Sequence, residues 1–271
     1  ALEQKYGGIL RGSFAIMRAG QKSNVARAEK QIISFKNGLA ELPQLLVAAL
    51  GEAVHSNVSI SSIQKIGVGW RVDWNGRTNI YDEVLLTTPA HALDKLPLDE
   101  SLQKALQPLL AIDYSPVSVL TVAFKRSDVA HPLDGFGVLV PEYEGRKILG
   151  VLFPASLFAS RAPAGEVLLT VFVGGERQAG LAVPDTDTLL ATVLPELNEL
   201  FGTTGEPTFS HHRHWPRAIP QYNLGYGKML AQMDAIEKKF VGLKLAGNYR
   251  DGISLSYCIE AAVSKEGHVT A

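Results

Sequence analysis

The residues best suited to chemistry lie near the end of the chain, where an apolar run over 241–246 stops at Gly247 and Gly252 follows. Residues 254–262 then read as a helix. A helix leaves the N–H groups of its first turn unpaired, and its dipole is positive at that end. Backbone donors at 253–255 could therefore hold an anionic or hydrogen-bond-accepting ligand. An ordinary strand-to-helix turn uses glycines in the same way, so the motif alone leaves both interpretations open.

Other arrangements for catalysis are weak in this chain. His211, His212 and His214 are a possible set of metal ligands, but neighbours in a strand point to opposite faces and no second ligand cluster accompanies them. No G-x-S-x-G nucleophile elbow is present, and no pair of catalytic carboxylates can be chosen. We therefore predict neither a metal site nor a catalytic side chain.

Composition narrows the classes of function. The chain has 271 residues, 46% hydrophobic and 20% charged, with a formal net charge of −1, as in an ordinary globular protein. Its lysines and arginines are scattered, which argues against a nucleic-acid-binding face. The longest apolar runs fall far short of the roughly 20 residues that span a bilayer. Cys258 is the only cysteine, so no internal disulfide can form and a cytoplasmic location is the default expectation. A peripheral membrane contact and a homodimer stay open.

The elements that must position these residues alternate between helix and strand without a strict βαβ rhythm. Asn75-Gly76 tolerates positive φ at both centres of a type I′ turn and predicts a hairpin between strands at 70–74 and 78–87. Asp185 is a predicted N-cap for an amphipathic helix over 186–201. Further strands are predicted at 58–66, 116–126, 135–141, 147–154, 167–173, 207–214 and 241–246, and further helices at 39–54, 91–96, 99–110 and 226–239. This pattern predicts an α+β fold.

Six segments, in chain order, carry a family resemblance. They are residues 35–42, 58–63, 84–90, 135–141, 170–175 and 215–222, the last of which reads WPRAIPQY. Together with the glycine turn near the end, they resemble the FAD-dependent protoporphyrinogen oxidases of the flavin amine oxidase and phytoene desaturase superfamily. The matched segments are spread over nearly the whole chain, so a chance likeness at one of them would not produce the series.

The resemblance implies an enzyme that binds FAD and oxidises protoporphyrinogen IX or coproporphyrinogen III in haem biosynthesis, with hydride transfer to the flavin and release of hydrogen peroxide from oxygen. It implies an FAD-binding part at 35–97 and 215–271, the returning half of a Rossmann-like domain. A substrate-binding part of mixed or antiparallel sheet would occupy 1–34 and 98–214. The implied cofactor-binding residues are Ile63, Trp215, Gly247, Gly252, Ile253, Ser254 and Leu255. The implied apolar wall for the substrate is Phe136, Gly137, Leu139 and Phe172; without the family, these residues read as plain sheet core.

Two departures qualify the resemblance. The dinucleotide fingerprint G-x-G-x-x-G, which should open a protein of this family, is absent, since Gly67-Val68-Gly69 lies between strands and opens no helix. Gly225-Tyr226 stands where the family usually has glycine-histidine. We therefore expect this chain to be the carboxyl-terminal portion of a longer oxidase and to be inactive by itself. Another flavin amine oxidase or desaturase, and a non-catalytic module of the same fold, are the alternatives.

Overall fold

The computed structural model describes residues 32–266, and the chain divides into two compact units, Ala1–Val54 and His55–Ala271. In the first unit, helix α3 (Glu41–Leu50) continues into a short 3-10 turn, η1 (Gly51–Ala53). This confirms the helix predicted over 39–54, with shorter bounds. No residue of α3 is buried.

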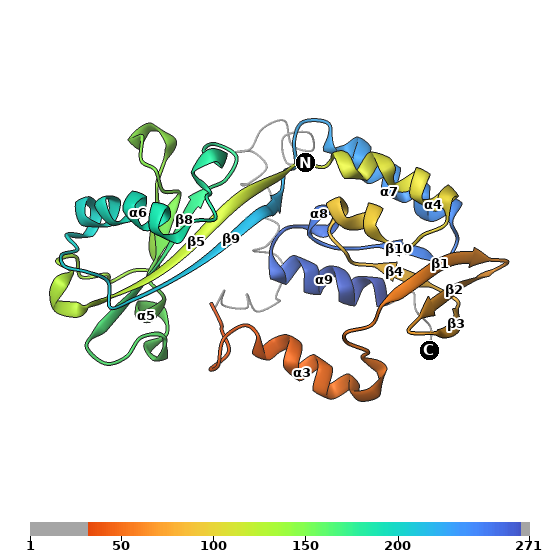
Figure 1. Ribbon diagram of the computed structural model, residues 1–271, viewed down its shortest axis with the longest axis horizontal. Coiled ribbons are helices and arrows are strands. Elements are labelled where there is room, and N and C mark those ends of the chain that lie inside the picture. The colour runs from red at the N-terminus through yellow and green to blue at the C-terminus, as the bar shows by residue number, and fades with distance from the viewer. Residues whose placement is uncertain (1–31, 267–271) are drawn as a thin grey trace, which may run out of the picture. The chain divides into compact units, whose positions relative to one another are not determined.

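A five-stranded sheet forms one part of the second unit (Figure 1). Its strands run in the order β6 (Gly137–Leu139), β7 (Gly150–Leu152), β8 (Glu166–Gly174), β5 (Tyr114–Lys125) and β9 (Phe209–Pro220). All neighbouring strands are antiparallel. β9 extends well beyond the predicted strand at 207–214, whereas β6 and β7 are shorter than the predicted strands at 135–141 and 147–154.

Helix α6 (Thr186–Phe201) packs on one face of this sheet. Asp185 caps it by accepting a hydrogen bond from the Thr188 N–H at 2.7 Å, which confirms the predicted N-cap and start. The first core fills the space between the helix and the sheet, with fully buried Leu120, Val122, Leu169, Val171, Leu189, Val193 and Leu197 among its members. Burial of each such side chain stabilises the fold by about 1.5–3 kcal/mol, so this face of the sheet is firmly held.

A parallel pair of strands and a small antiparallel sheet lie around a second core. The pair is β4 (Val84–Leu86) with β10 (Leu243–Leu245), and the sheet is β1 (Ile60–Ile66), β2 (Gly69–Trp74) and β3 (Arg77–Tyr81). Asn75 and Gly76 join β2 to β3 with φ of 45° and 75°, which confirms the predicted hairpin. The single strand predicted at 78–87 is wrong, because β3 pairs with β2 while β4 pairs in parallel with β10.

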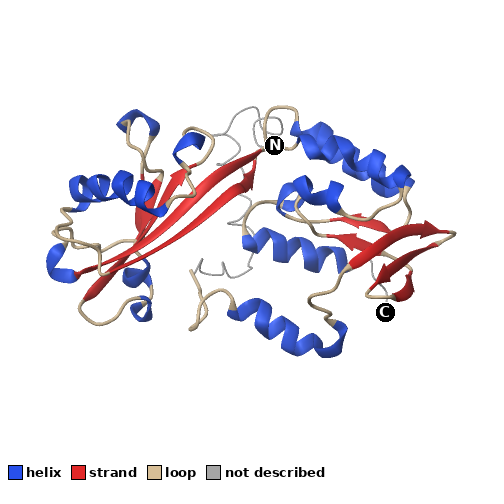
Figure 2. Cartoon of the chain, in the orientation of Figure 1, coloured by secondary structure: helices blue, strands red, loops and turns tan. Residues whose placement is uncertain are grey.

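Helices and 3-10 turns complete the second unit (Figure 2). The elements that contribute to the second core are η2 (Ala90–Lys95), α4 (Glu100–Leu106), η3 (Gln107–Ala111), α7 (Tyr226–Lys239) and α8 (Asn248–Asp251), and α9 (Leu255–Glu266) follows α8. The others are η4 (Arg126–Asp128), η5 (Glu142–Glu144), α5 (Pro154–Leu157), η6 (Ala159–Arg161) and η7 (Ala179–Leu181). Over the described range 32–266, no helix is both long and apolar enough to cross a bilayer.

The mixture of helices and separate sheets confirms the α+β class. Leu102, Leu106 and Leu109, which fall in the predicted substrate-binding part, pack in the second core beside residues of β1 and β10. The division into an FAD-binding part and a substrate-binding part remains a proposal. Residues 1–31, assigned to the substrate-binding part, lie outside the described residues.

Candidate functional site

The face of the five-stranded sheet opposite α6 is called here the open sheet face. Directly paired residues of antiparallel strands point to the same side, so the register defines it. One row across the five strands joins Leu139, Gly150, Phe172, Val119 and Arg213. The next row joins Gly137, Leu152, Thr170, Thr121 and His211, and Val117 pairs with Trp215 on the same side.

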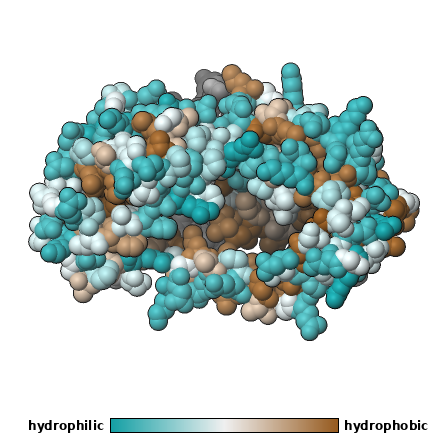
Figure 3. Space-filling model, in the orientation of Figure 1, coloured by the Kyte–Doolittle hydropathy of each residue, from teal (hydrophilic) through white to brown (hydrophobic). Residues whose placement is uncertain are grey.

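The register brings Gly137, Leu139 and Phe172, three of the residues predicted for the substrate wall, onto this face. Leu139 is 89% exposed, and Phe172 is half-buried between its neighbours. Phe136, the fourth predicted residue, immediately precedes β6 and is 48% exposed. Figure 3 shows several apolar areas on a face of the molecule that is otherwise largely hydrophilic. An apolar sheet surface that is only partly covered can pack against a flat apolar ligand.

Trp215, predicted as a cofactor-binding residue, also lies on the open sheet face. Its side chain is 46% exposed, and the Arg213 guanidinium carbon is 4.5 Å from the centre of its ring, a cation–π contact. The structure therefore places Trp215 with the predicted substrate residues in the sheet, apart in the chain from the glycine turn.

The three histidines of β9 divide between the two faces, as predicted from strand alternation. His211 lies on the open sheet face, whereas His212 and His214 face α6 and contact the hydroxyls of Thr186 at 3.2 Å and Ser118 at 3.1 Å. Burial, with the nearby His214 and His211, lowers the pKa of His212. In the part of the chain that the structure describes, no group of three His, Cys, Asp or Glu residues could hold a metal.

The backbone conformation and the packing of the sheet both favour glycine at position 137. Its φ is 151°, and a Cβ there would lie 2.3 Å from the Val151 carbonyl oxygen and 2.9 Å from the Leu152 Cα. Both atoms belong to the backbone of β7, which cannot move aside as a flexible side chain can. A larger residue at Gly137 therefore disturbs the sheet itself, so substitution there cannot report on substrate contact alone.

The glycine turn after β10 contains more structure than the sequence predicts. β10 ends at Leu245, α8 begins directly after Gly247, and Gly252 lies between α8 and α9. The Gly247 N–H donates to Asp251 Oδ2 at 3.2 Å, so this donor is already used. Ser254 Oγ accepts a hydrogen bond from the Tyr257 N–H at 3.1 Å, which makes Ser254 the N-cap of α9.

The residues at the start of α9 combine exposed side chains with a tightly packed glycine. Ile253 and Leu255 are about half exposed. At Gly252, with φ of 116°, a Cβ would lie 2.9 Å from Tyr257 Cδ2. The turn is therefore shaped by the Tyr257 ring, and the first turn of α9 lies at an accessible surface where its donors can meet a ligand.

Arg250 fixes the turn to helix α7. Its guanidinium donates to Asp234 Oδ1 at 2.8 Å, to Glu237 Oε2 at 3.1 Å and to the Leu245 carbonyl at 3.1 Å, and it also contacts Glu237 Oε1. Glu237 Oε1 in turn accepts the Leu245 N–H at 2.7 Å. Because both side chains are mostly buried, this ion pair is weakly screened and holds the end of β10 in place.

Two tyrosines, Tyr222 and Tyr226, contact α8, and a third, Tyr249, belongs to it. The hydroxyls of Tyr222 and Tyr226 donate to the carbonyls of Asn248 and Tyr249, and the Tyr222 and Tyr226 rings are 4.6 Å apart. Burial raises the pKa of Tyr226 and that of Tyr249 well above the usual range. These hydroxyls therefore stay protonated and act as neutral hydrogen-bond groups.

Ile63 belongs to β1, a strand that carries none of the other predicted residues. It is 3% exposed in β1, its side chain is part of the second core, and its N–H donates to the Pro97 carbonyl at 2.8 Å. A cofactor contact at Ile63 could therefore involve only the backbone, and that contact stays a prediction.

Unpaired polar atoms gather near the carboxyl ends of the parallel strands. Three of the five buried side-chain atoms that lack a hydrogen-bond partner in the described residues are Thr88 Oγ1, His91 Nδ1 and Tyr249 OH. Thr88 and His91 follow β4, and Tyr249 follows β10. Buried polar atoms normally have partners, and the carboxyl ends of parallel strands are a common place for ligands. Thr88 Oγ1 and Tyr249 OH therefore fit the polar groups of a bound flavin cofactor, whereas His91 also lines the cavity described next.

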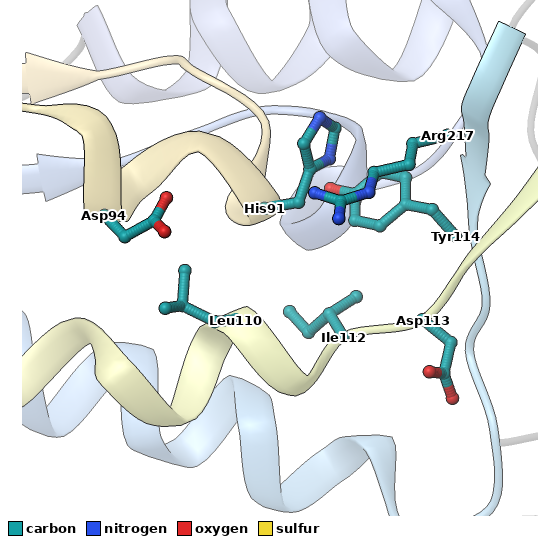
Figure 4. Close-up of a pocket in the computed structure, with 7 residues that line it drawn as sticks. All are labelled: His91, Asp94, Leu110, Ile112, Asp113, Tyr114 and Arg217. Atoms are coloured by element: carbon teal, nitrogen blue, oxygen red, sulfur yellow. The ribbon is translucent and has the colours of Figure 1, made fainter.

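A cavity of about 380 Å³ lies where η2, the start of β5 and β9 meet (Figure 4). Its lining residues are His91, Asp94, Leu110, Ile112, Asp113, Tyr114 and Arg217. The His91 and Tyr114 rings meet edge to face at 4.7 Å, and Tyr114 OH accepts the Ala90 N–H at 3.1 Å. Burial lowers the pKa of His91, and the positive charges of Arg217 and Lys95 lower it further.

Sequence reasoning missed this cavity. Arg217 lies inside the matched segment 215–222 and His91 follows the segment 84–90, but neither segment indicates that the two side chains meet. Their proximity depends on how β9 crosses from the open sheet face towards the second core, which no local pattern encodes.

Comparison with known proteins finds a matching family model and similar sequences. The sequence model of the family described as flavin containing amine oxidoreductase matches residues 2–264. A mitochondrial protoporphyrinogen oxidase of Nicotiana tabacum is 38% identical over 185 residues, which cover 67% of this chain and 37% of the relative. Protoporphyrinogen oxidase 2 of Arabidopsis thaliana is 31% identical over 282 residues, which cover 95% of this chain and 56% of the relative.

Solved structures share the fold. A protein from Exiguobacterium sp. 255-15, named as a candidate protoporphyrinogen oxidase, superposes with a TM-score of 0.76 at 22% identity. The match covers 98% of this chain and 56% of that protein. This match and the one to the Arabidopsis relative extend along nearly the whole of this chain. The chain spans only about half the length of each of these two matched proteins.

Proposed function

The chain belongs to the flavin containing amine oxidoreductase family, and from that premise we propose that it forms part of an FAD-dependent porphyrinogen oxidase. The proposed reaction is the oxidation of protoporphyrinogen IX or coproporphyrinogen III to the porphyrin in haem biosynthesis, with molecular oxygen as the acceptor. The names of the relatives in tobacco and Arabidopsis support the substrate class.

The open sheet face is the observation that carries this proposal. A porphyrinogen is a large tetrapyrrole with an apolar ring system, so its pocket needs an extended apolar wall. Leu139, Phe172 and Trp215 supply apolar and aromatic surface in one plane, while the opposite face of the same sheet is filled by α6. Packing on this wall would orient the substrate and exclude water from one side of it.

The chain's own residues would position the reactants. The chemistry that FAD supplies when bound is acceptance of a hydride from a bridging carbon of the substrate, and oxygen then recovers the oxidised flavin with release of hydrogen peroxide. The backbone N–H groups at 253–255 would donate to the flavin edge, and the α9 dipole would favour negative charge there by about 0.3–1 kcal/mol. Arg250 and Glu237 would hold that turn at a fixed position.

The proposed organisation is the one that the family resemblance implies. Residues 35–97 and 215–271 would be the returning half of the FAD-binding domain, and 1–34 with 98–214 the substrate-binding domain. The chain would be the carboxyl-terminal portion of the oxidase, with the pyrophosphate contacts supplied by the portion not represented here. A homodimer and a peripheral membrane contact belong to the same proposal.

Two alternatives make different demands on the site. Another flavin amine oxidase or desaturase would need an aromatic cage beside the flavin or a long narrow tunnel. The open sheet face carries Leu139, Phe172 and Trp215 on three different strands, β6, β8 and β9, and this spread favours a broad, flat substrate. A non-catalytic module would bind no flavin, and an absorbance spectrum of the full-length protein would show this.

The test places a charge on the open sheet face of the full-length, flavin-loaded protein. Leu139→Asp is suitable because the side chain is 89% exposed, so its replacement leaves the core intact. We expect the KM for porphyrinogen to rise about tenfold or more, because the substrate loses apolar contact, with flavin content unchanged. Val68→Asp, at a 94% exposed turn between β1 and β2, is the matched control and should leave KM unaltered. Failure of the wild type to oxidise any porphyrinogen, or equal kinetics in the two variants, would overturn the proposal.

A further inference from the structure

An irregularity in β9 directs Arg217 away from the regular sheet ladder. Ser115 pairs with Ile219 and Val117 pairs with Trp215, so residues 216–218 of β9 stand opposite Pro116 alone. Such a bulge bends the strand and changes the direction of its side chains, and bulges are frequent beside active sites. Figure 4 shows that the Arg217 side chain extends towards His91 and Tyr114.

Arg217 has a charge that the described residues do not neutralise directly. Among residues 32–266, no ion pair involves its guanidinium. Asp113 lines the same cavity, but its carboxylate contacts the Asn223 amide at 3.3 Å and points away from the guanidinium in Figure 4. Asp94 lies on the far side of the cavity. A planar guanidinium with free donors at the rim of a cavity is suited to hold a carboxylate through two parallel hydrogen bonds.

His91 adds a second polar group at the same place. Its Nδ1 is buried and has no hydrogen-bond partner among the described residues, although buried polar atoms normally have one. Its ring is held edge-on against Tyr114, whose hydroxyl is engaged with the Ala90 N–H. The imidazole is therefore fixed in place, with a polar atom that a ligand entering the cavity could satisfy.

We propose that Arg217, with His91 beside it, forms a carboxylate subsite that binds one acidic side chain of the tetrapyrrole substrate. This inference rests on the proposed function. Trp215 on the open sheet face is only two residues before Arg217, so the apolar wall and the subsite are neighbours along one strand. The ring system would pack on the wall while a peripheral carboxylate reaches the cavity. The same anion-binding chemistry could instead serve the pyrophosphate of FAD, and the experiment separates the two.

The experiment uses the full-length, flavin-loaded protein with Arg217→Gln and Arg217→Lys. KM and kcat are measured with a porphyrinogen that carries free carboxylates and with its methyl ester, and the affinity for the corresponding porphyrins is measured by fluorescence titration. We expect Arg217→Gln to raise KM and the porphyrin Kd at least tenfold for the free acid and to leave the ester unchanged. Arg217→Lys keeps the charge without the planar fork and should recover part of the affinity.

Control measurements decide between the outcomes. Arg71→Gln removes the same charge from an exposed position on β2 and should change neither KM nor Kd. Flavin content should be the same in all variants; a selective loss of flavin in Arg217→Gln with free-acid KM unchanged would assign the anion site to the cofactor and overturn the inference. Equal effects on acid and ester, or wild-type affinity in Arg217→Gln, would also overturn it while leaving the oxidase function intact. A wild-type protein that oxidises no porphyrinogen would instead remove the proposed function and this subsite together.

Discussion

The open sheet face and the turn after β10 present the groups that we propose for binding in opposite ways. On the sheet, backbone groups are engaged in the ladder and the side chains of Leu139, Phe172 and Trp215 form the surface. In the turn, the side chains of Asp251 and Ser254 are engaged with the backbone, and the groups left for a ligand are the first N–H groups of α9.

This difference separates two kinds of tolerance to substitution. An exposed side chain on the sheet can change without loss of fold, so its replacement reports on ligand contact. A residue that shapes the backbone cannot change without altering the structure, and its replacement reports on stability first. Gly137 belongs to the second kind although it lies on the open sheet face, and it supplies the sharpest test of the comparison.

The largest effect is expected for Gly137→Ala. The new Cβ would clash with the backbone of β7, and alanine disfavours a φ of 151°. We expect the free energy of unfolding to fall by about 2–5 kcal/mol, from the strained backbone and the overpacking together. Urea unfolding followed by circular dichroism measures it.

Gly135→Ala is the matched control for this prediction. Gly135 lies in the same segment, but a Cβ there would meet no atom within 4 Å. Its unfolding free energy should stay within about 0.5 kcal/mol of the wild type. If Gly137→Ala proves as stable as this control, the sheet does not require the glycine, and contact with a ligand becomes its remaining explanation.

More of the sheet structure than of the turn structure could be predicted from the sequence. The Asn75-Gly76 hairpin and the Asp185 cap are local signals, and both are confirmed. The grouping of Gly137, Leu139 and Phe172 follows from the resemblance and from the alternation of strands once their register is known. Register itself depends on long-range pairing, which a single sequence does not specify. Hence the extension of β9 to Pro220 and its bulge were missed.

The turn was predicted only in outline because its detail is side-chain capping. Helix α8 has four residues, too few to show a helical period, and the bond from Gly247 to Asp251 depends on that helix. The cavity around Arg217 and His91 brings together three segments distant in sequence. Such a meeting is a property of the tertiary structure and leaves no pattern in any one segment.

A smaller effect is expected for Ser254→Ala at the start of α9. The substitution removes the hydroxyl that accepts the Tyr257 N–H, and loss of an N-cap destabilises a helix by about 0.5–2 kcal/mol. Amide exchange at Tyr257 should accelerate, as measured by hydrogen–deuterium exchange. If the flavin is held by backbone donors, flavin content and reduction potential should change little in the full-length protein.

Ser256→Ala separates capping from a general effect on the helix. Ser256 is exposed in the same first turn of α9, and its replacement should leave the Tyr257 amide protected. If Ser254→Ala abolishes flavin binding while α9 stays protected, the hydroxyl itself contacts the flavin. The turn would then bind through a side chain, as the sheet does, and the proposed difference between the two regions would be wrong.

The smallest effect concerns His91, which lies where the sheet meets the second core. Its pKa is lowered by burial, then by the positive charges of Arg217 and Lys95, against the opposite influence of Asp94. As the pH falls below the ordinary histidine pKa of 6.5, the unfolded chain takes up a proton that the folded protein resists, so folding stability is lost. His91→Phe keeps an aromatic ring against Tyr114 and removes this titration. The variant should therefore lose less unfolding free energy than the wild type between pH 7.5 and pH 5.5.

His212, whose pKa is also lowered, contributes a loss of the same sign in both proteins. The slope of unfolding free energy against pH should therefore shrink in His91→Phe without vanishing. Parallel slopes in the two proteins would mean that the protonated His91 finds a partner in the folded state, and burial would then not disfavour its charge.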